Sequence, residues 1–124
     1  MANWPGTPNA APAQSINSVG AGYEASGLVP VTGTFAATGQ SKAFTPVAGR
    51  GFNASLWGTF VATVQVERSF DSGATWLPLT ANGTQLEKFT AAASEQLQED
   101  ESGVQYRFNC TAYTSGTVNY RLSQ

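Results

Sequence analysis

Hydrophobic and polar side chains alternate over residues 60–70, which is the pattern of a β-strand with one buried and one solvent-facing side. One row holds the apolar side chains Phe60, Ala62, Val64, Val66 and Phe70. The other row holds the polar side chains Thr63, Gln65, Glu67 and Ser69. Because successive side chains of a strand point to opposite faces, we expect the first row in the core and the second in water. Arg68 interrupts the inner row, and we expect it near the strand end, with its guanidinium in water.

The same two-residue period returns near the C-terminus. The predicted inward row is Val104, Tyr106, Phe108, Cys110 and Ala112, followed after a turn at residues 114–116 by Val118, Tyr120 and Leu122. Two alternating strands joined by a short turn predict a terminal hairpin. Cys110 lies in the inward row and has no histidine to activate it, so we expect a small buried hydrophobe rather than a nucleophile.

Shorter runs of the same kind complete the pattern. The further strand candidates are residues 29–37, 42–46, 52–57, 76–80, 86–90 and, less clearly, 93–98. Residues that tolerate positive φ separate them, and the predicted hairpins or corners are 37–40, 49–51 and 81–84. About eight short antiparallel strands predict an all-β domain over residues 28–124, either a β-sandwich or a jelly-roll-like fold.

Residues 1–27 lack any such period. They contain three prolines and four glycines, and no Asp, Glu, Lys or Arg precedes Glu24. We therefore predict an extended N-terminal arm. Its large apolar side chains are Trp4, Ile16, Val19 and Tyr23. Two interpretations stay open: a loose terminus, or an arm that orders by placing these side chains on a neighbouring subunit.

Composition limits the chemistry. The 124 residues are 41% hydrophobic, which supports one domain with a core, and only 11% are charged. The chain has no histidine and one cysteine, so it lacks the commonest general base and cannot form an internal disulfide or a multi-cysteine zinc site. We therefore predict that the protein is not an enzyme and that it uses no cofactor and no metal.

Charge and hydropathy exclude two classes of partner. The formal net charge is −2, and the six Lys and Arg residues are scattered, whereas binding to phosphates needs them clustered. We therefore expect no nucleic-acid binding. No apolar run reaches the length of a membrane span, and the first residues do not resemble a secretion signal. The sequence thus predicts no membrane association and synthesis in the cytoplasm of the producing cell.

The sharpest local motif is residues 69–76, which match S-x-D-x-G-x-T-W, the Asp-box known from sialidases and other β-propeller proteins. The motif residues are Ser69, Asp71, Gly73, Thr75 and Trp76. The Asp side chain caps turn amides, the glycine supplies a permissive φ, and we expect Trp76 to return the chain to the core. A sialidase needs a much longer chain with repeated boxes and an arginine cluster. The box therefore predicts a structural turn without catalysis.

Two further groups are candidates for interaction. The acidic run Glu99, Asp100 and Glu101, with Glu95 nearby, lacks the spacing of a calcium loop and of a glycosidase pair. It is either a solvated loop or a negative patch that faces a partner. Trp57 and Tyr113 lie off the inward parity of their strands, so both are candidates for exposure. They would stack on a sugar, bury in a subunit contact or pack at a sheet edge.

Two stretches taken together carry a family resemblance. Residues 64–76, and 106–108 through 111–117 to 120–122, resemble small β-rich virion proteins encoded among the structural genes of tailed bacteriophages. The resemblance implies a capsid decoration or cement protein that binds the major capsid protein on the outside of the phage head. It also implies a homo-oligomer, with a trimer favoured, that bridges capsid subunits through its arm or acidic loop and opposes rupture of the shell.

Two alternatives remain. The first is a carbohydrate- or host-binding module of a tail fibre, in which Trp57, Tyr113 or Trp76 forms a stacking platform. The second is a head-tail connector or another tail component. A glycan platform requires aromatic side chains exposed side by side, whereas a cement protein requires apolar residues at subunit contacts.

Overall fold

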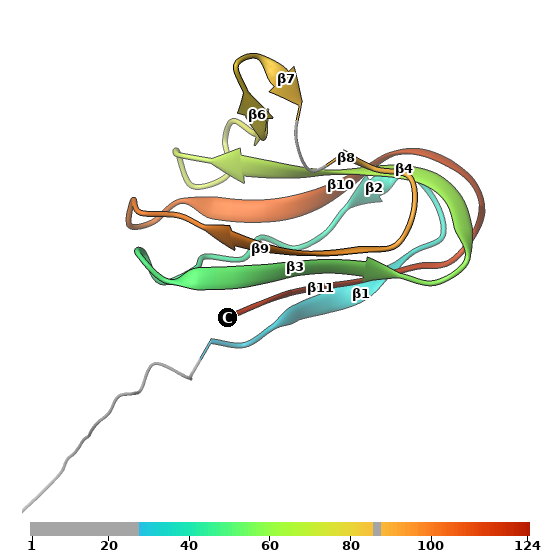
Figure 1. Cartoon of the computed structure of the whole chain (residues 1–124), viewed down its shortest axis with the longest axis horizontal. Coiled ribbons are helices and arrows are strands. Elements are labelled where there is room, and N and C mark those ends of the chain that lie inside the picture. The colour runs from blue at the N-terminus through green and yellow to red at the C-terminus, as the bar shows by residue number, and fades with distance from the viewer. Residues whose placement is uncertain (1–27, 86–87) are drawn as a thin grey trace, which may run out of the picture.

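The strand with the clearest alternation lies at the centre of a sheet. β4 (Phe60–Ser69) pairs antiparallel with β10 (Gln105–Gly116), as expected for two long strands that each bury an apolar row. The structure is a computed structural model and describes residues 28–85 and 88–124. Within these residues all regular structure is β, and two antiparallel sheets pack face to face (Figure 1). The predicted all-β sandwich is confirmed.

Strand pairing defines the two sheets. The first sheet has the order β1 (Val31–Phe35), β11 (Val118–Ser123), β3 (Gly51–Trp57) and β9 (Ala93–Gln98). The second sheet has the order β2 (Gly39–Gln40), β10, β4, with β5 (Leu77–Pro78) and β8 (Lys88–Phe89) both along one edge of β4. A separate hairpin consists of β6 (Thr80–Ala81) and β7 (Thr84–Gln85), and it stands outside the second sheet (Figure 1).

The connections between the sheets give the sandwich a jelly-roll topology. β1 continues into β2, β3 into β4, β8 into β9 and β10 into β11, and every one of these steps changes sheet. The connections of these four steps are residues 36–38, 58–59, 90–92 and 117. They lie at the same end of the sandwich, on the right in Figure 1, and we call this the switch end. The opposite end, with segments 41–50, 70–76 and 99–104, is the loop end. Segments 41–50, between β2 and β3, and 99–104, between β9 and β10, also change sheet.

The core lies between the sheets and follows the predicted inward rows. It consists of Phe35, Phe44, Phe52, Ala54, Leu56, Ala62, Val64, Val66, Val104, Tyr106, Phe108, Cys110, Val118, Tyr120 and Leu122. Aromatic rings meet within it, with centroids 4.7 Å apart both in the Phe35–Tyr120 pair of the first sheet and in the Phe52–Tyr106 pair between the sheets. Cys110 is buried, as predicted, and burial raises the pKa of its thiol. Burial of these side chains from water supplies the main driving force for the fold.

The end of β4 differs from its predicted pattern. Glu67 and Ser69, expected in water, are buried, whereas Phe70, expected in the core, is exposed. The strand ends at Ser69, so Phe70 already belongs to the following turn and the alternation no longer applies to it. Glu67 is buried because β5 pairs beside it and neighbouring side chains cover its carboxylate.

The predicted C-terminal hairpin is wrong. β10 pairs with β4 and β2, whereas β11 pairs with β1 and β3 in the other sheet. Register shifts after Cys110 and after Tyr113 also reverse the alternation in β10. Ala112, expected in the core, is therefore exposed, and Tyr113 packs against the core instead of facing water. A bulge adds one residue to a strand and so moves every later side chain to the other face.

The remaining strand predictions hold in part. Candidates 52–57 and 93–98 match β3 and β9 closely, whereas 29–37 shortens to β1. Candidate 42–46 contributes a single bridge from Phe44 to Tyr106, and 76–80 divides between β5 and the start of β6. Within candidate 86–90, residues 88–89 form β8, and residues 86–87 lie outside the described residues.

The three predicted turns have different outcomes. Residues 81–84 form the expected hairpin turn, with φ of 51° at Asn82 and 77° at Gly83. Residues 49–51 form a corner, with φ of 81° at Gly49. Residues 37–40 do not close a hairpin, because they belong to a sheet-switching connection and to β2.

Candidate functional site

The Asp-box forms the tight turn that the sequence predicts. The Ser69 hydroxyl donates a hydrogen bond to Asp71 Oδ1 (2.7 Å) and accepts one from the N–H of Gly73 (2.9 Å). Asp71 Oδ1 also accepts the N–H of Thr75 (2.8 Å), and these bonds hold the pKa of Asp71 below its ordinary value. Gly73 has a φ of 90°, which favours glycine. All of these contacts serve the turn itself, so the box is structural.

Trp76 does not return the chain to the core. Its side chain is half-buried beside the second sheet, and the Arg107 guanidinium lies 4.3 Å from the centre of its ring. Arg107 points away from the core because its neighbours Tyr106 and Phe108 point into it. The tryptophan thus covers the outer face of the sheet, and Arg107 already occupies one face of its ring.

Glu67 lies at the centre of a hydrogen-bond network on this outer face. Only 5% of the residue is exposed, and its carboxylate accepts bonds from Arg107 Nε (2.9 Å), Asn109 Nδ2 (2.8 Å) and Gln65 Nε2 (2.5 Å). Burial alone raises the pKa of Glu67, but the three donors outweigh burial and leave the pKa lowered. Gln85 of β7 donates to Gln65 (2.7 Å), which ties the projecting hairpin to the sheet. The network is internally satisfied and is structural.

The acidic run does not form a uniform patch. Glu99 is buried at the loop end, where Oε1 accepts bonds from Arg68 (3.0 Å) and the Tyr106 hydroxyl (2.8 Å). Neither the solvated-loop nor the negative-patch interpretation holds for this residue. Asp100 and Glu101 are exposed beside it. Burial raises the pKa of Glu99 by itself, but the backbone N–H of Glu101 and the Tyr106 and Arg68 donors leave it lowered.

The two aromatic candidates have different surroundings. Trp57 is 48% exposed at the end of β3, so its predicted exposure is confirmed. Tyr113 is half-buried, packs against the core and donates its hydroxyl to the carbonyl of Gly116 (2.6 Å). The expected exposure of Tyr113 is therefore wrong, because the register shift in β10 turns it inward. Trp57 belongs to the first sheet and Trp76 flanks the second, so they form no shared platform.

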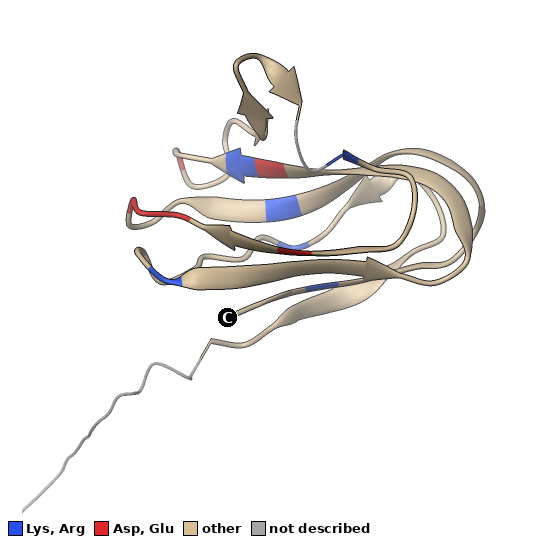
Figure 2. Cartoon of the chain, in the orientation of Figure 1, with Lys and Arg blue, Asp and Glu red and all other residues tan. Residues whose placement is uncertain are grey.

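Charged residues are absent from one end of the described domain. Segments 28–41, 51–66, 89–94 and 108–120 contain no Asp, Glu, Lys or Arg. These segments supply the four connections at the switch end, and Figure 2 shows no charged position there. Positions 50, 71 and 99–101 lie at the loop end. The switch end is uncharged, and it carries the exposed side chains of Trp57 and Val61, the latter 58% exposed.

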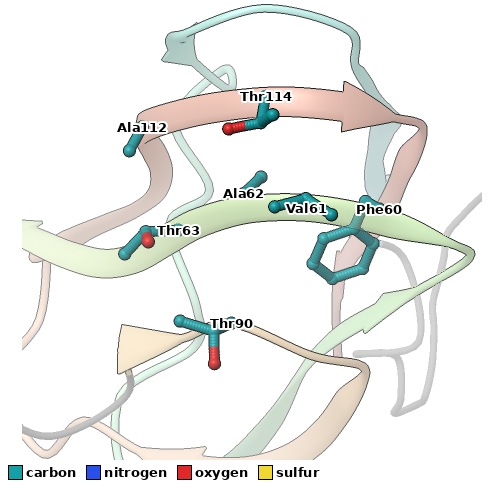
Figure 3. Close-up of a pocket in the computed structure, with 7 residues that line it drawn as sticks. All are labelled: Phe60, Val61, Ala62, Thr63, Thr90, Ala112 and Thr114. Carbon is teal, nitrogen blue, oxygen red and sulfur yellow. The ribbon is translucent and has the colours of Figure 1, made fainter.

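A shallow groove lies on the second sheet beside the switch end. Its volume is about 270 Å³, and it is lined by Phe60, Val61, Ala62, Thr63, Thr90, Ala112 and Thr114 (Figure 3). β4 crosses the groove, with Thr90 on one side and the β10 residues on the other (Figure 3). Its lining side chains are apolar or carry a hydroxyl, and none is charged. Such a surface fits an apolar side chain of a protein partner better than a charged ligand.

Sequence reasoning missed Val61 and the groove. Four separate segments of the sequence contain no charged residue. This absence identifies a surface only once the topology shows that the four segments meet at one end of the sandwich. The predicted interaction residues Trp4, Ile16, Val19 and Tyr23 lie outside the described residues.

The described residues contain no group of three His, Cys, Asp or Glu side chains that could hold a metal ion. Across residues 28–85 and 88–124, no helix is long and apolar enough to cross a membrane. Comparison with known proteins yields no match, whether with family models, curated proteins or solved structures. The function is therefore inferred from the surface of the molecule.

Proposed function

We propose that this protein is a non-enzymatic component of a tailed-bacteriophage virion, a decoration or cement protein that binds the major capsid protein on the outside of the head. The observation that carries the proposal is the uncharged switch end with its exposed Trp57 and Val61. The buried centres of protein interfaces are depleted in charge and enriched in aromatic side chains. The phage assignment itself draws on the resemblance of residues 64–76 and 106–122.

The rest of the domain supports an assembly role. The ion pairs Arg107–Glu67 and Arg68–Glu99 stabilise the fold. The pKa values of both carboxylates are lowered by hydrogen bonds from other residues of the domain. The rigid jelly roll thus presents an uncharged end to the shell and a charged end to solvent. Contact with more than one capsid subunit would add buried area between them and oppose shell rupture.

The alternative of a glycan-binding module is less well supported. Trp57 lies on the first sheet, Trp76 is stacked under Arg107, and Tyr113 packs against the core. A sugar ring needs a free aromatic face with polar side chains around it. The separation of these three residues favours the assembly role.

Imaging and binding test the proposal together. Purified virions with and without the protein are imaged to locate it, and binding to undecorated heads is measured for Val61→Lys and for the matched control Ser102→Lys at the loop end. We expect density on the head exterior, binding weakened at least tenfold by Val61→Lys, and no change for Ser102→Lys. Density at the connector or tail, or equal binding of both variants, would contradict the proposal.

A further inference from the structure

The two edges of the first sheet differ in how they are protected. β9 forms one edge, and Glu95 lies in its inward row, opposite Ala54 of β3. A charged side chain on the inward row of an edge strand discourages pairing with another strand. Neighbouring positions 94, 96 and 98 are also polar. The β9 edge is therefore a poor template for an added strand.

The β1 edge has no such protection. In the described part of the chain β1 pairs with β11 alone, so the backbone groups along its other side face outward. No ionisable residue occurs between Leu28 and Ser41. Val29, just before the strand, is 80% exposed. An uncharged edge strand of this kind readily accepts another strand through backbone hydrogen bonds.

A cleft of about 360 Å³ opens beside this edge. Its lining residues are Val29, Pro30, Val31, Thr32, Lys42 and Tyr120. Tyr120 is only 9% exposed, and the described residues offer its hydroxyl no hydrogen-bond partner. A Cβ on Gly33 would lie 2.5 Å from this hydroxyl oxygen, so glycine is needed there to admit the tyrosine. The hydroxyl is therefore open to the cleft, where a backbone group of an added strand could take the place of water as its hydrogen-bond partner.

The first 27 residues of the chain are long enough to lie along this edge, and their composition suits pairing with it. They join the domain at Leu28, next to the cleft residues Val29 and Pro30, and an extended chain of that length spans about 90 Å. They carry no Asp, Glu, Lys or Arg before Glu24, so a strand from residues 1–23 would bring no charged side chain to the β1 edge. Residues 13–23 contain no proline, which leaves every N–H free to pair, and they include Ile16 and Val19.

We propose that residues 1–27 of one copy bind along the open β1 edge of a neighbouring copy, extending its first sheet and placing an apolar side chain in the cleft beside Tyr120. The neighbouring copy is chosen over the same copy because the sequence resemblance implies a homo-oligomer. Repeated from copy to copy, a head-to-tail contact of this kind generates a ring when its rotation closes. The inference rests on the homo-oligomer that the resemblance implies, but not on binding to a capsid.

Four full-length variants test the proposal by solution mass as a function of concentration. The double variant Ile16→Asp/Val19→Asp alters the arm, with Asn9→Asp as its control. Thr32→Lys alters the β1 edge, with Ser94→Lys on the β9 edge as its control. We expect an oligomeric wild type. The arm and β1 variants should raise the concentration for half-association at least tenfold with unchanged melting at low concentration, and both controls should match the wild type.

Hydrogen exchange at β1 distinguishes the remaining outcomes. Protection of the β1 amides in the wild type, lost in the arm variant, supports the proposal when the wild type is also oligomeric. A monomer in which the outward-facing β1 amides, those not bonded to β11, are protected would mean that the arm binds its own copy, which overturns it. Loss of association in Thr32→Lys alone would mean pairing of two β1 edges, and loss in neither variant would mean another interface. Either result overturns the proposal whether or not the protein binds capsids.

Discussion

At the scale of single residues, two buried carboxylates organise the polar side chains of the sandwich. Glu67 gathers donors on the outer face of the second sheet, and Glu99 gathers them at the loop end. Each carboxylate is stabilised in its charged form because hydrogen bonds outweigh the effect of burial on its pKa. A depressed pKa in the folded state makes stability depend on pH.

Replacement of Glu67 tests this dependence. The folded pKa of Glu67 lies below the unfolded value near 4.5, so its stabilisation is complete above that pH and is lost as the pH falls through the folded pKa. Glu67→Gln should lower the unfolding free energy at pH 7 by about 1–3 kcal/mol, because an amide places donors against the donors of Asn109 and Gln65. Urea unfolding at pH 7 and pH 3 should show the difference shrinking in acid. The exposed Glu95→Gln serves as the control.

Tyr106 gives a prediction in the alkaline range. Burial, together with the hydrogen bond to Glu99, raises the pKa of Tyr106 to about 12. The associated stabilisation is complete below the unfolded pKa of 10 and is lost as the pH rises through 12. Tyr106→Phe should cost about 1.5–3 kcal/mol at pH 7 by removing a bond to a charged acceptor. Absorbance titration of the folded protein should lose its highest tyrosine step, and a persistent step would refute the assignment.

At the scale of elements, the Asp-box turn depends on Ser69 more than its sequence suggests. The side chain is fully buried and bonds both Asp71 and the Gly73 N–H. Ser69→Ala should cost about 1–3 kcal/mol, because it leaves these groups without their buried partner. Thermal melting is the measurement, and Ser72→Ala in the exposed part of the same turn is the control. Equal melting of both variants would show that the turn holds without the serine.

The sheet-switching connections give the second element-scale prediction. Gly116 has a φ of 89°, and a Cβ there would clash with the carbonyl oxygen of Thr59 in the neighbouring connection. Gly83 has a similar φ of 77° but open space around it. Gly83→Ala should therefore cost only backbone strain, about 1 kcal/mol, and Gly116→Ala should cost more, about 2–3 kcal/mol. Similar unfolding free energies for the two variants would argue against close packing of the connections.

Sequence patterns predicted the strands better than they predicted which strands pair with one another. Alternation identified the inward rows of β3, β4, β10 and β11, because burial of one face imposes a period of two. It could not show that β10 and β11 lie in different sheets, since a chain that turns into a hairpin and one that changes sheet share the same local pattern. The bulge after Cys110 was equally hidden, and it reversed the prediction for Tyr113. The candidate surface depends on this topology, so only Trp57 was identified beforehand.

At the scale of the whole molecule, charge separates the two ends of the sandwich. The switch end is free of charged positions, and the loop end carries several of them (Figure 2). The open β1 edge forms a third distinct surface along the side of the first sheet. Because the three surfaces do not coincide, contacts between copies and contacts with a shell can form at the same time.

Removal of residues 1–27 tests how these surfaces relate to folding. The core cluster begins at Phe35, and its side chains come from residues 35–122 of the described sandwich. A chain that starts at Leu28 should therefore match the unfolding free energy of the full-length protein within about 0.5 kcal/mol at low concentration. At high concentration the full-length protein should melt higher, because association stabilises the folded state by mass action. If the shortened chain fails to fold, the arm completes the core; if the two melting curves never diverge, the arm makes no contact between copies.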